Sequence, residues 1–252
     1  MKIKGTVALV TGANRGLGLS FVEALIEFGA AKIYATARDP EALSPLVGKY
    51  PDQVTPLALD VTRQDQVDAA VINAPDVTLL INNAGALVQR GLIEANDLSG
   101  LELEMAVNVY GVARMCQGFA PVIEANGGGA IANMLSNASM VNFPAFGTYS
   151  ASKAAAMSLT DCLRYEVLER GIEVFGVYAG FIDTDMIDNI SGEKTSPSEI
   201  ANNTLRGIEA GDVDIDTDHK VKNTRQELRN DPEGLKAAAW ERARIFRKEH
   251  PL

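Results

Sequence analysis

The sequence predicts an α/β protein with a doubly wound, mostly parallel sheet of about seven strands and helices on both faces. Short apolar runs rich in β-branched residues recur along the chain, as expected for strands that are buried on both faces. An amphipathic helical pattern follows most of these runs, and this alternation is typical of a parallel sheet. A glycine-rich turn also joins the first run to the first helix.

The elements follow from these patterns in order. Strands are expected at Thr6–Thr11, Lys32–Thr36, Thr55–Leu59, Thr78–Asn82, Ala130–Met134 and Glu173–Val177. Helices are expected at Leu17–Glu27, Asp65–Ile72, Leu101–Glu124 and Ala151–Arg170. Charged and apolar residues alternate in Asp212–Asp216, which predicts a half-exposed edge strand. A calcium loop is the alternative there, but Thr217 and Asn223 occupy the positions that need glycine and glutamate.

The domain organisation is expected to be simple. We find no repeat, low-complexity tract or linker, so residues 1–252 are interpreted as one domain. A charged helical extension is expected from about residue 219, ending in a helix over Asp231–Leu252 around Trp240.

Composition and charge exclude several classes of protein. A formal net charge of −10 disfavours nucleic acid as a partner. We find neither a signal peptide nor a run of the ~18 apolar residues that span a bilayer, so the expected location is the cytoplasm, with no membrane partner. Cys116 and Cys162 lie in apolar helical patterns and are interpreted as buried structural thiols, and no metal site is expected.

The glycine-rich turn predicts a dinucleotide site. It reads Thr11-Gly12-Ala13-Asn14-Arg15-Gly16-Leu17-Gly18. Glycines at such a turn let the backbone approach a pyrophosphate, which then rests on the helix N-terminus. Because the turn lies between a strand and a helix, a Rossmann-type site is favoured over a plain tight turn.

The end of the second strand indicates which dinucleotide binds. Proteins that prefer NAD place an acid there, whereas this chain has Ala37 followed by Arg38. A guanidinium suits a 2′-phosphate, and Arg15 in the glycine turn could supply a second one. We therefore predict NADP(H), with Asp39 left open as a displaced acid.

A tyrosine and a lysine suggest acid/base chemistry. Tyr149 and Lys153 are four residues apart, so on a helix they share one face. A nearby cation favours phenolate and lowers a pKa that starts near ~10. Such a tyrosine could exchange a proton with a carbonyl oxygen near neutral pH.

The turn at Thr11–Gly18 resembles the fingerprint of the short-chain dehydrogenase/reductase family. Matching motifs follow in order as far as Thr184: Asp60-Val61, Asn82-Asn83-Ala84-Gly85, Asn108-Val109-Tyr110-Gly111, Ser136, Tyr149-Ser150-Ala151-Ser152-Lys153, and Ala179-Gly180-Phe181-Ile182-Asp183-Thr184. The last motif departs from the family, because Ala179 replaces a proline and leaves the turn less rigid.

The resemblance implies an oxidoreductase that moves a hydride between a nicotinamide and a carbonyl or alcohol. The implied catalytic residues are Asn108, Ser136, Tyr149 and Lys153. The implied cofactor-binding residues are Gly12, Asn14, Arg15, Gly16, Leu17, Gly18, Arg38, Asp60, Val61, Asn83, Ala84, Gly85, Tyr149, Lys153, Gly180, Ile182 and Thr184. Ser139 remains an alternative to Ser136.

Each of these residues has an implied role. Tyr149 is the general acid/base, Ser136 orients the carbonyl, and Lys153 binds the nicotinamide ribose. Asn108 holds a water that connects the lysine to solvent. Contacts to adenine come from Asp60-Val61. The Ile182 backbone and the Thr184 hydroxyl hold the carboxamide.

The substrate is expected to be a small carbonyl compound or alcohol with an apolar body. The pocket walls are expected from Met140, Val141, Phe143 and Phe146, and Met186–Ser196 should form a lid with Gly192 as a hinge. A homodimer through the two long helices is predicted, with a tetramer as the alternative. A regulatory NADP(H) sensor without turnover is the alternative function.

Overall fold

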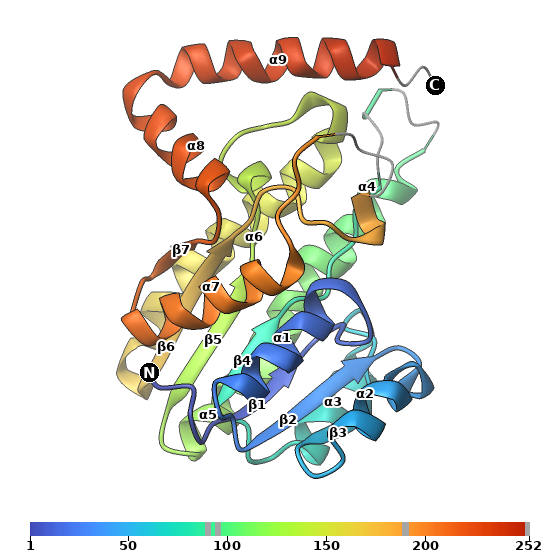
Figure 1. Ribbon diagram of the computed structural model, residues 1–252, viewed down its shortest axis with the longest axis vertical. Helices are drawn as coiled ribbons and strands as arrows, with labels where there is room; N and C mark the ends of the chain where they lie inside the picture. Colours follow the sequence, from blue (N-terminus) through green and yellow to red (C-terminus); the bar gives the residue numbers. More distant parts are fainter. Residues whose placement is uncertain (89–91, 94–96, 188–191, 250–252) are drawn as a thin grey trace.

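The computed structural model describes residues 1–88, 92–93, 97–187 and 192–249 (Figure 1). Its centre is one seven-stranded sheet in the order β3-β2-β1-β4-β5-β6-β7, and all six neighbouring pairs are parallel. The strands are β1 Val7–Val10, β2 Lys32–Ala37, β3 Val54–Ala58, β4 Leu79–Asn82, β5 Gly129–Met134, β6 Ile172–Tyr178 and β7 Asp214–Asp216. The predicted fold class is confirmed, and the edge strand begins slightly later than expected.

Helices cover both faces of the sheet. They are α1 Gly16–Glu27, α2 Ser44–Lys49, α3 Gln64–Asn73, α4 Ser99–Met105, α5 Val112–Ala125, α6 Gly147–Glu166, α7 Pro197–Ala210, α8 His219–Asn230 and α9 Pro232–Glu249. A π-helical turn, Ala106–Gly111, joins α4 to α5. None of the helices within the described ranges is both long enough and apolar enough to cross a membrane.

Some helix predictions were wrong or incomplete. The expected helix Leu101–Glu124 contains the π-helical turn, and α6 begins earlier than expected, at Gly147. The short α2 and the helix α7 were not predicted. For α7 a signal was present, since Ser196 caps it by accepting a hydrogen bond from the Glu199 N–H at 3.2 Å.

The two faces of β1 explain how the core is divided. Ala8 and Val10 point into a cluster that includes Phe21 of α1. Leu9, between them, points into the opposite cluster with Phe119 of α5. Because side chains alternate along a strand, one short apolar run serves both cores, which is why the sequence showed continuous rather than alternating hydrophobicity.

The order of the strands locates the ligand crevice. β1 and β4 are neighbours, although β2 and β3 separate them in the sequence. Chain connections run in opposite directions from this point, and ligands of such sheets bind where the strands reach their carboxyl ends. The segments after β1 and β4 are therefore the first place to look for a site.

The last two helices extend beyond the sheet. In Figure 1, α9 crosses the top of the molecule beyond the upper ends of β4 and β5. Its residues Leu235 and Ala239 pack against Val141, which lies on the segment between β5 and α6. Trp240 of α9 is instead 71% exposed.

Charged side chains cover the edge strand β7. Arg225 of α8 donates to both carboxylate oxygens of Asp216, at 2.8–3.0 Å, and its guanidinium lies 4.6 Å from the Tyr178 ring centroid. Arg164 of α6 donates to Asp214 at 2.6 Å. The aspartates that suggested an edge strand therefore also attach α8 and α6 to it.

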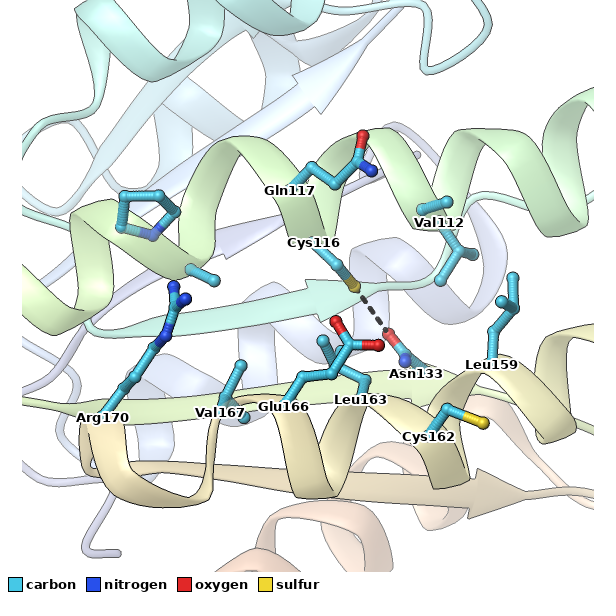
Figure 2. Close-up of a pocket in the computed structure, with 13 residues that line it drawn as sticks. Val112, Cys116, Gln117, Asn133, Leu159, Cys162, Leu163, Glu166, Val167 and Arg170 are labelled. Carbon is cyan, nitrogen blue, oxygen red and sulfur yellow. Dashed lines mark hydrogen bonds between the residues drawn. The ribbon is translucent and has the colours of Figure 1, made fainter.

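A groove of about 330 Å³ runs between α5 and α6 (Figure 2). Cys116 lies in its wall, and burial raises the pKa of this thiol to about 12. Cys162 also lines the groove but is exposed, so the prediction that both cysteines are buried was wrong. The reason is that Cys162 lies on α6 with Leu159 and Glu166, which also line the groove (Figure 2), and all three are exposed.

Candidate active site

The glycine turn has a backbone conformation and close packing that require glycine. Gly12 and Gly16 have φ angles of 67° and 54°, a region that side chains disfavour. A Cβ atom on Gly18 would lie 2.0 Å from the Gly12 carbonyl oxygen. The turn can therefore exist only with glycine at Gly18, and α1 begins close against the end of β1.

Asn83 and Thr11 hold the segment after β4 against this turn. The Thr11 hydroxyl accepts hydrogen bonds from the backbone N–H groups of Asn83 and Ala84, both at 2.9 Å. In return, the Asn83 side chain donates to the Thr11 carbonyl oxygen at 2.8 Å. Hydrogen bonds thus join the turn after β1 to the predicted cofactor-binding segment after β4 at the switch point.

The segment after β6 reaches the same place. A Cβ atom on Gly16 would lie 3.2 Å from Thr184 Cγ2, and Arg15 pairs with Asp185 at 2.6 Å. The Gly180 N–H donates to Asp218 at 2.8 Å. Asp218 also caps α8, and sequence analysis had not singled it out. The structure thus brings the glycine turn and the segment Gly180–Thr184 together.

The two predicted phosphate-binding arginines are exposed at the rim of this turn. The Ala13 N–H donates to the Thr36 carbonyl oxygen at 2.8 Å, so the turn lies next to the end of β2, directly before Arg38. The alternative acid, Asp39, accepts a hydrogen bond from the Glu41 N–H at 3.0 Å. Asp39 therefore serves as the cap of the short turn that follows.

Asp60 and Val61, which were predicted to contact adenine, make mainly local structural contacts after β3. The Asp60 carboxylate accepts hydrogen bonds from both the N–H and the hydroxyl of Thr62, at 2.9 and 2.7 Å. Val61 is buried, and a Cβ atom on Gly111 would lie 2.7 Å from its Cγ2. Asp60 therefore shapes its own turn, while Val61 packs against the π-helical turn.

Ser136 and Ser139 have different roles at the end of β5. The Ser136 hydroxyl accepts a hydrogen bond from the Ala138 N–H at 3.1 Å and lies close enough to the Tyr149 phenol to lower its pKa. The Ser139 hydroxyl is turned back and accepts from the Ser136 N–H at 3.2 Å. The structure therefore brings Ser136, rather than Ser139, to the phenol.

Tyr149 and Lys153 lie together near the start of α6. The Lys153 ammonium is 5.8 Å from the centroid of the Tyr149 ring and donates to the Met134 carbonyl oxygen at 2.8 Å. Lys153 is buried and Tyr149 is partly buried. The ammonium therefore faces the end of β5 as well as the phenol.

The predicted lowering of the Tyr149 pKa is not found in this structure. Burial raises the pKa of Tyr149 to about 12, against the effect of the nearby Ser136 hydroxyl. Burial also lowers the pKa of Lys153 to about 8. Loss of hydration disfavours both charged forms, and this outweighs the helical proximity on which the prediction depended.

Asn108 lies in the π-helical turn and is almost fully buried. Its amide accepts from the Ala86 N–H at 2.8 Å and donates to the Ala86 carbonyl oxygen and the Ser152 hydroxyl, both at 2.9 Å. A Cβ atom on Gly85 would lie 3.5 Å from Asn108 Oδ1 and 4.0 Å from Lys153 Nζ. Asn108 thus fixes the chain at Gly85-Ala86 beside the lysine.

Glu104, one helical turn before Asn108, was missed by the sequence analysis. It is fully buried, and it accepts a hydrogen bond from the Val88 N–H at 2.7 Å. Its charge acts on Tyr149. A signal was available, because an acid at this position interrupts the buried stripe that continues through Asn108 and Val112.

The predicted substrate walls divide into two groups. Phe143 and Tyr149 pack against a cluster formed by Phe146 and Ile187. Val141, in contrast, is buried core beneath α9, so it was assigned to the pocket wrongly, whereas Met140 is partly buried and its place in the pocket stays a prediction. The predicted lid Met186–Ser196 includes residues 188–191, which lie outside the described residues.

Taken together, the fold and this edge of the sheet define a dinucleotide-binding α/β oxidoreductase. A family model described as short chain dehydrogenase matches residues 6–195, so the chain belongs to the short-chain dehydrogenase family. The family prediction is therefore confirmed.

Relatives of known name agree with this membership. A sorbitol dehydrogenase from Cereibacter sphaeroides is 32% identical over 198 residues, 77% of each chain. A 3-oxoacyl-(acyl-carrier-protein) reductase from Vibrio cholerae is 30% identical over 84% of this chain and 85% of that protein. A short chain dehydrogenase from Burkholderia cenocepacia, solved in complex with NADP, is 40% identical with a TM-score of 0.90, covering 95% of this chain and 99% of that one.

Proposed function

We propose that this protein is an NADP(H)-dependent carbonyl reductase. It transfers a hydride between the nicotinamide and a ketone, an aldehyde or a secondary alcohol, with Tyr149 as the general acid/base. The observation that carries the proposal is the meeting of three groups at the carboxyl edge of the sheet: the Tyr149 phenol, the nearby Ser136 hydroxyl, and the Lys153 ammonium.

The residues at the switch point fit an NADP(H) dinucleotide. The backbone turn suits a pyrophosphate, since Gly12 and Gly16 have positive φ angles and Gly18 lets α1 begin directly against the turn. Arg38 and Arg15 are exposed at the adjoining rim; Arg38 can bind a 2′-phosphate, and Arg15 can do so when it leaves its ion pair with Asp185. The NADP complex of the 40% identical Burkholderia protein supports the same choice.

The protein's part in reduction is to hold and protonate the carbonyl. Ser136 and Tyr149 both donate hydrogen bonds to the carbonyl oxygen, which places its carbon for attack. NADPH supplies the hydride when it is bound. Tyr149 then gives its proton to the oxygen, and the Lys153 ammonium stabilises the phenolate that remains.

The raised pKa of Tyr149 supports reduction as the easier direction. A phenol with a pKa of about 12 stays protonated at neutral pH, so its proton is available to the reduced oxygen. Alcohol oxidation needs the phenolate instead, and we expect its rate to increase with pH through the alkaline range, whereas reduction does not.

A screen of ketones and aldehydes with NADPH tests the proposal. Turnover of at least one carbonyl class, abolished by Tyr149→Phe, is the expected result. Tight NADPH binding without turnover of any carbonyl would instead favour the regulatory sensor. Apolar carbonyls are the first to try, because Phe143, Phe146 and Phe181 gather beside Tyr149.

For the assembly we propose a homodimer through α5 and α6. Leu159, Tyr165 and Leu168 are 42%, 83% and 70% exposed on or just after α6, and the groove beside them is the one in Figure 2. A second copy of the same face would bury these side chains. Contacts of a tetramer through β7 are disfavoured, because Arg164 and Arg225 already occupy its aspartates.

A further inference from the structure

Glu104 is buried beside the acid/base tyrosine, and family membership assigns it no role. We propose that Glu104 is a positioning residue of the reaction: its carboxylate holds the loop after β4 at Val88, lies near Thr148 in the first turn of α6, and places a negative charge beside Tyr149. The proposal rests on the function proposed above.

The first contact joins α4 to the loop after β4. Glu104 Oε1 accepts from the Val88 N–H at 2.7 Å. The Val88 side chain also packs on the first turn of α4, where a Cβ atom on Gly100 would lie 3.0 Å from Val88 Cγ1. Asn108 binds the same loop at Ala86, one helical turn further along. Two polar side chains of one helical face thus hold the loop that leaves the switch point.

The second contact involves two buried oxygens. The Thr148 hydroxyl is near enough to lower the pKa of the Glu104 carboxyl, yet neither Thr148 Oγ1 nor Glu104 Oε2 has a hydrogen-bond partner among the described residues. The contact is therefore looser than a formed hydrogen bond. Buried polar atoms without a hydrogen-bond partner are rare in proteins. One of these two oxygens belongs to Thr148, which directly precedes Tyr149.

The third element is electrostatic. Burial raises the pKa of Glu104, while the Val88 N–H and the Thr148 hydroxyl act against this. The charge of Glu104 in turn raises the pKa of Tyr149. Among the described residues, the ionisable groups beside the phenol are Glu104 from α4 and Lys153 from α6. The two carry opposite charges, so Glu104 keeps the proton on Tyr149, whereas Lys153 favours its release.

Two substitutions separate the charge from the position of the carboxylate. Glu104→Gln keeps an oxygen for the Val88 N–H but removes the charge. We expect the Tyr149-dependent limbs of the pH–rate profiles, in reduction and in oxidation, to move to lower pH by about one unit, with the KM for the carbonyl within about twofold. Glu104→Asp keeps the charge but shortens the side chain. We expect its limbs to stay in place and its KM to increase by about fivefold or more.

Glu102→Gln is the matched control, because Glu102 is an exposed acid on the same helix. It should change neither the pH profile nor the KM. Unshifted limbs in a folded, active Glu104→Gln variant would overturn the proposal, as would an equal shift in Glu102→Gln. A merely structural Glu104 would change stability and leave the limbs in place.

A second readout separates this inference from the proposed function. If the wild-type protein reduces no carbonyl, the proposed function fails. NMR titration of ring-labelled tyrosine, with Tyr149 assigned from Tyr149→Phe, then measures the phenol directly. A lower pKa in Glu104→Gln than in wild type supports the charge effect without any turnover, and an unchanged pKa refutes it.

Discussion

At the carboxyl edge of the sheet, the turn Thr11–Gly18 and the first turns of α6 contribute to one site but are built in different ways. The turn is shaped by backbone: positive φ angles, and a glycine whose Cβ atom would overlap a carbonyl oxygen at 2.0 Å. The start of α6 is shaped by side chains from several elements, because Ser136, just after β5, and Glu104 of α4 both act on the pKa of Tyr149.

This difference determines how each part responds to change. Few residue types can adopt the backbone conformation of such a turn, so a short stretch of sequence is enough to predict it. A side-chain site takes its properties from burial and from neighbours far away in the chain, and these can reverse an expectation based on spacing. The predictions below test whether the two parts can be separated in this way.

The largest effect should come from Tyr149→Phe. Without the phenol no group donates the proton, so kcat should decrease by about 10³-fold, while the Kd for NADPH stays the same because the backbone turn is intact. Steady-state kinetics and fluorescence titration with NADPH measure the two quantities. Full activity in this variant would contradict the mechanism. A much higher Kd for NADPH would show that cofactor binding at the glycine turn depends on the start of α6.

Ser136→Ala should have the next largest effect, with Ser139→Ala as its control. Removing a hydroxyl that holds the carbonyl oxygen should decrease kcat by about 10²-fold. Ser139 makes its hydrogen bond to the Ser136 backbone at 3.2 Å, so its loss should affect stability more than rate. A larger decrease of kcat in Ser139→Ala than in Ser136→Ala would indicate that Ser139, not Ser136, orients the carbonyl.

On the cofactor side, Arg38→Asp combined with Arg15→Gln should raise the KM for NADPH by about tenfold or more. The KM for NADH should hardly change, because NADH has no 2′-phosphate. The comparison of both dinucleotides is its own control. Equal increases for NADPH and NADH would show that the arginines do not distinguish the phosphate.

The smallest effect on catalysis is expected from changes in the groove between α5 and α6. Leu159→Asp with Tyr165→Glu should convert the proposed dimer to a monomer, since a buried charge in an interface is costly. Light scattering measures the mass, and the cofactor Kd should stay the same. A wild-type protein whose mass indicates a monomer or a tetramer would refute this interface.

The sequence was sufficient for the fold class, the family and the glycine turn, because each depends on local spacing or on a backbone requirement; it also predicted that Ser136, Tyr149 and Lys153 lie together, although their catalytic roles stay a proposal. It was not sufficient for the protonation chemistry. The positive shift of the Tyr149 pKa and the enclosure of Glu104 arise only when α4, α6 and the ends of β4 and β5 pack together. The prediction that Cys162 is buried was wrong for a similar reason, since an apolar helical pattern does not show which side of the helix faces solvent.

Asp218 carries a consequence for how the tail and the cofactor depend on each other. One of its oxygens accepts from the Gly180 N–H at 2.8 Å, and the other accepts from the Val221 N–H at the start of α8 at 3.0 Å. Thermodynamic linkage is reciprocal. A dinucleotide that steadies the segment at Gly180 must therefore slow hydrogen exchange in α8, and fraying of the tail must weaken the dinucleotide's hold in equal measure.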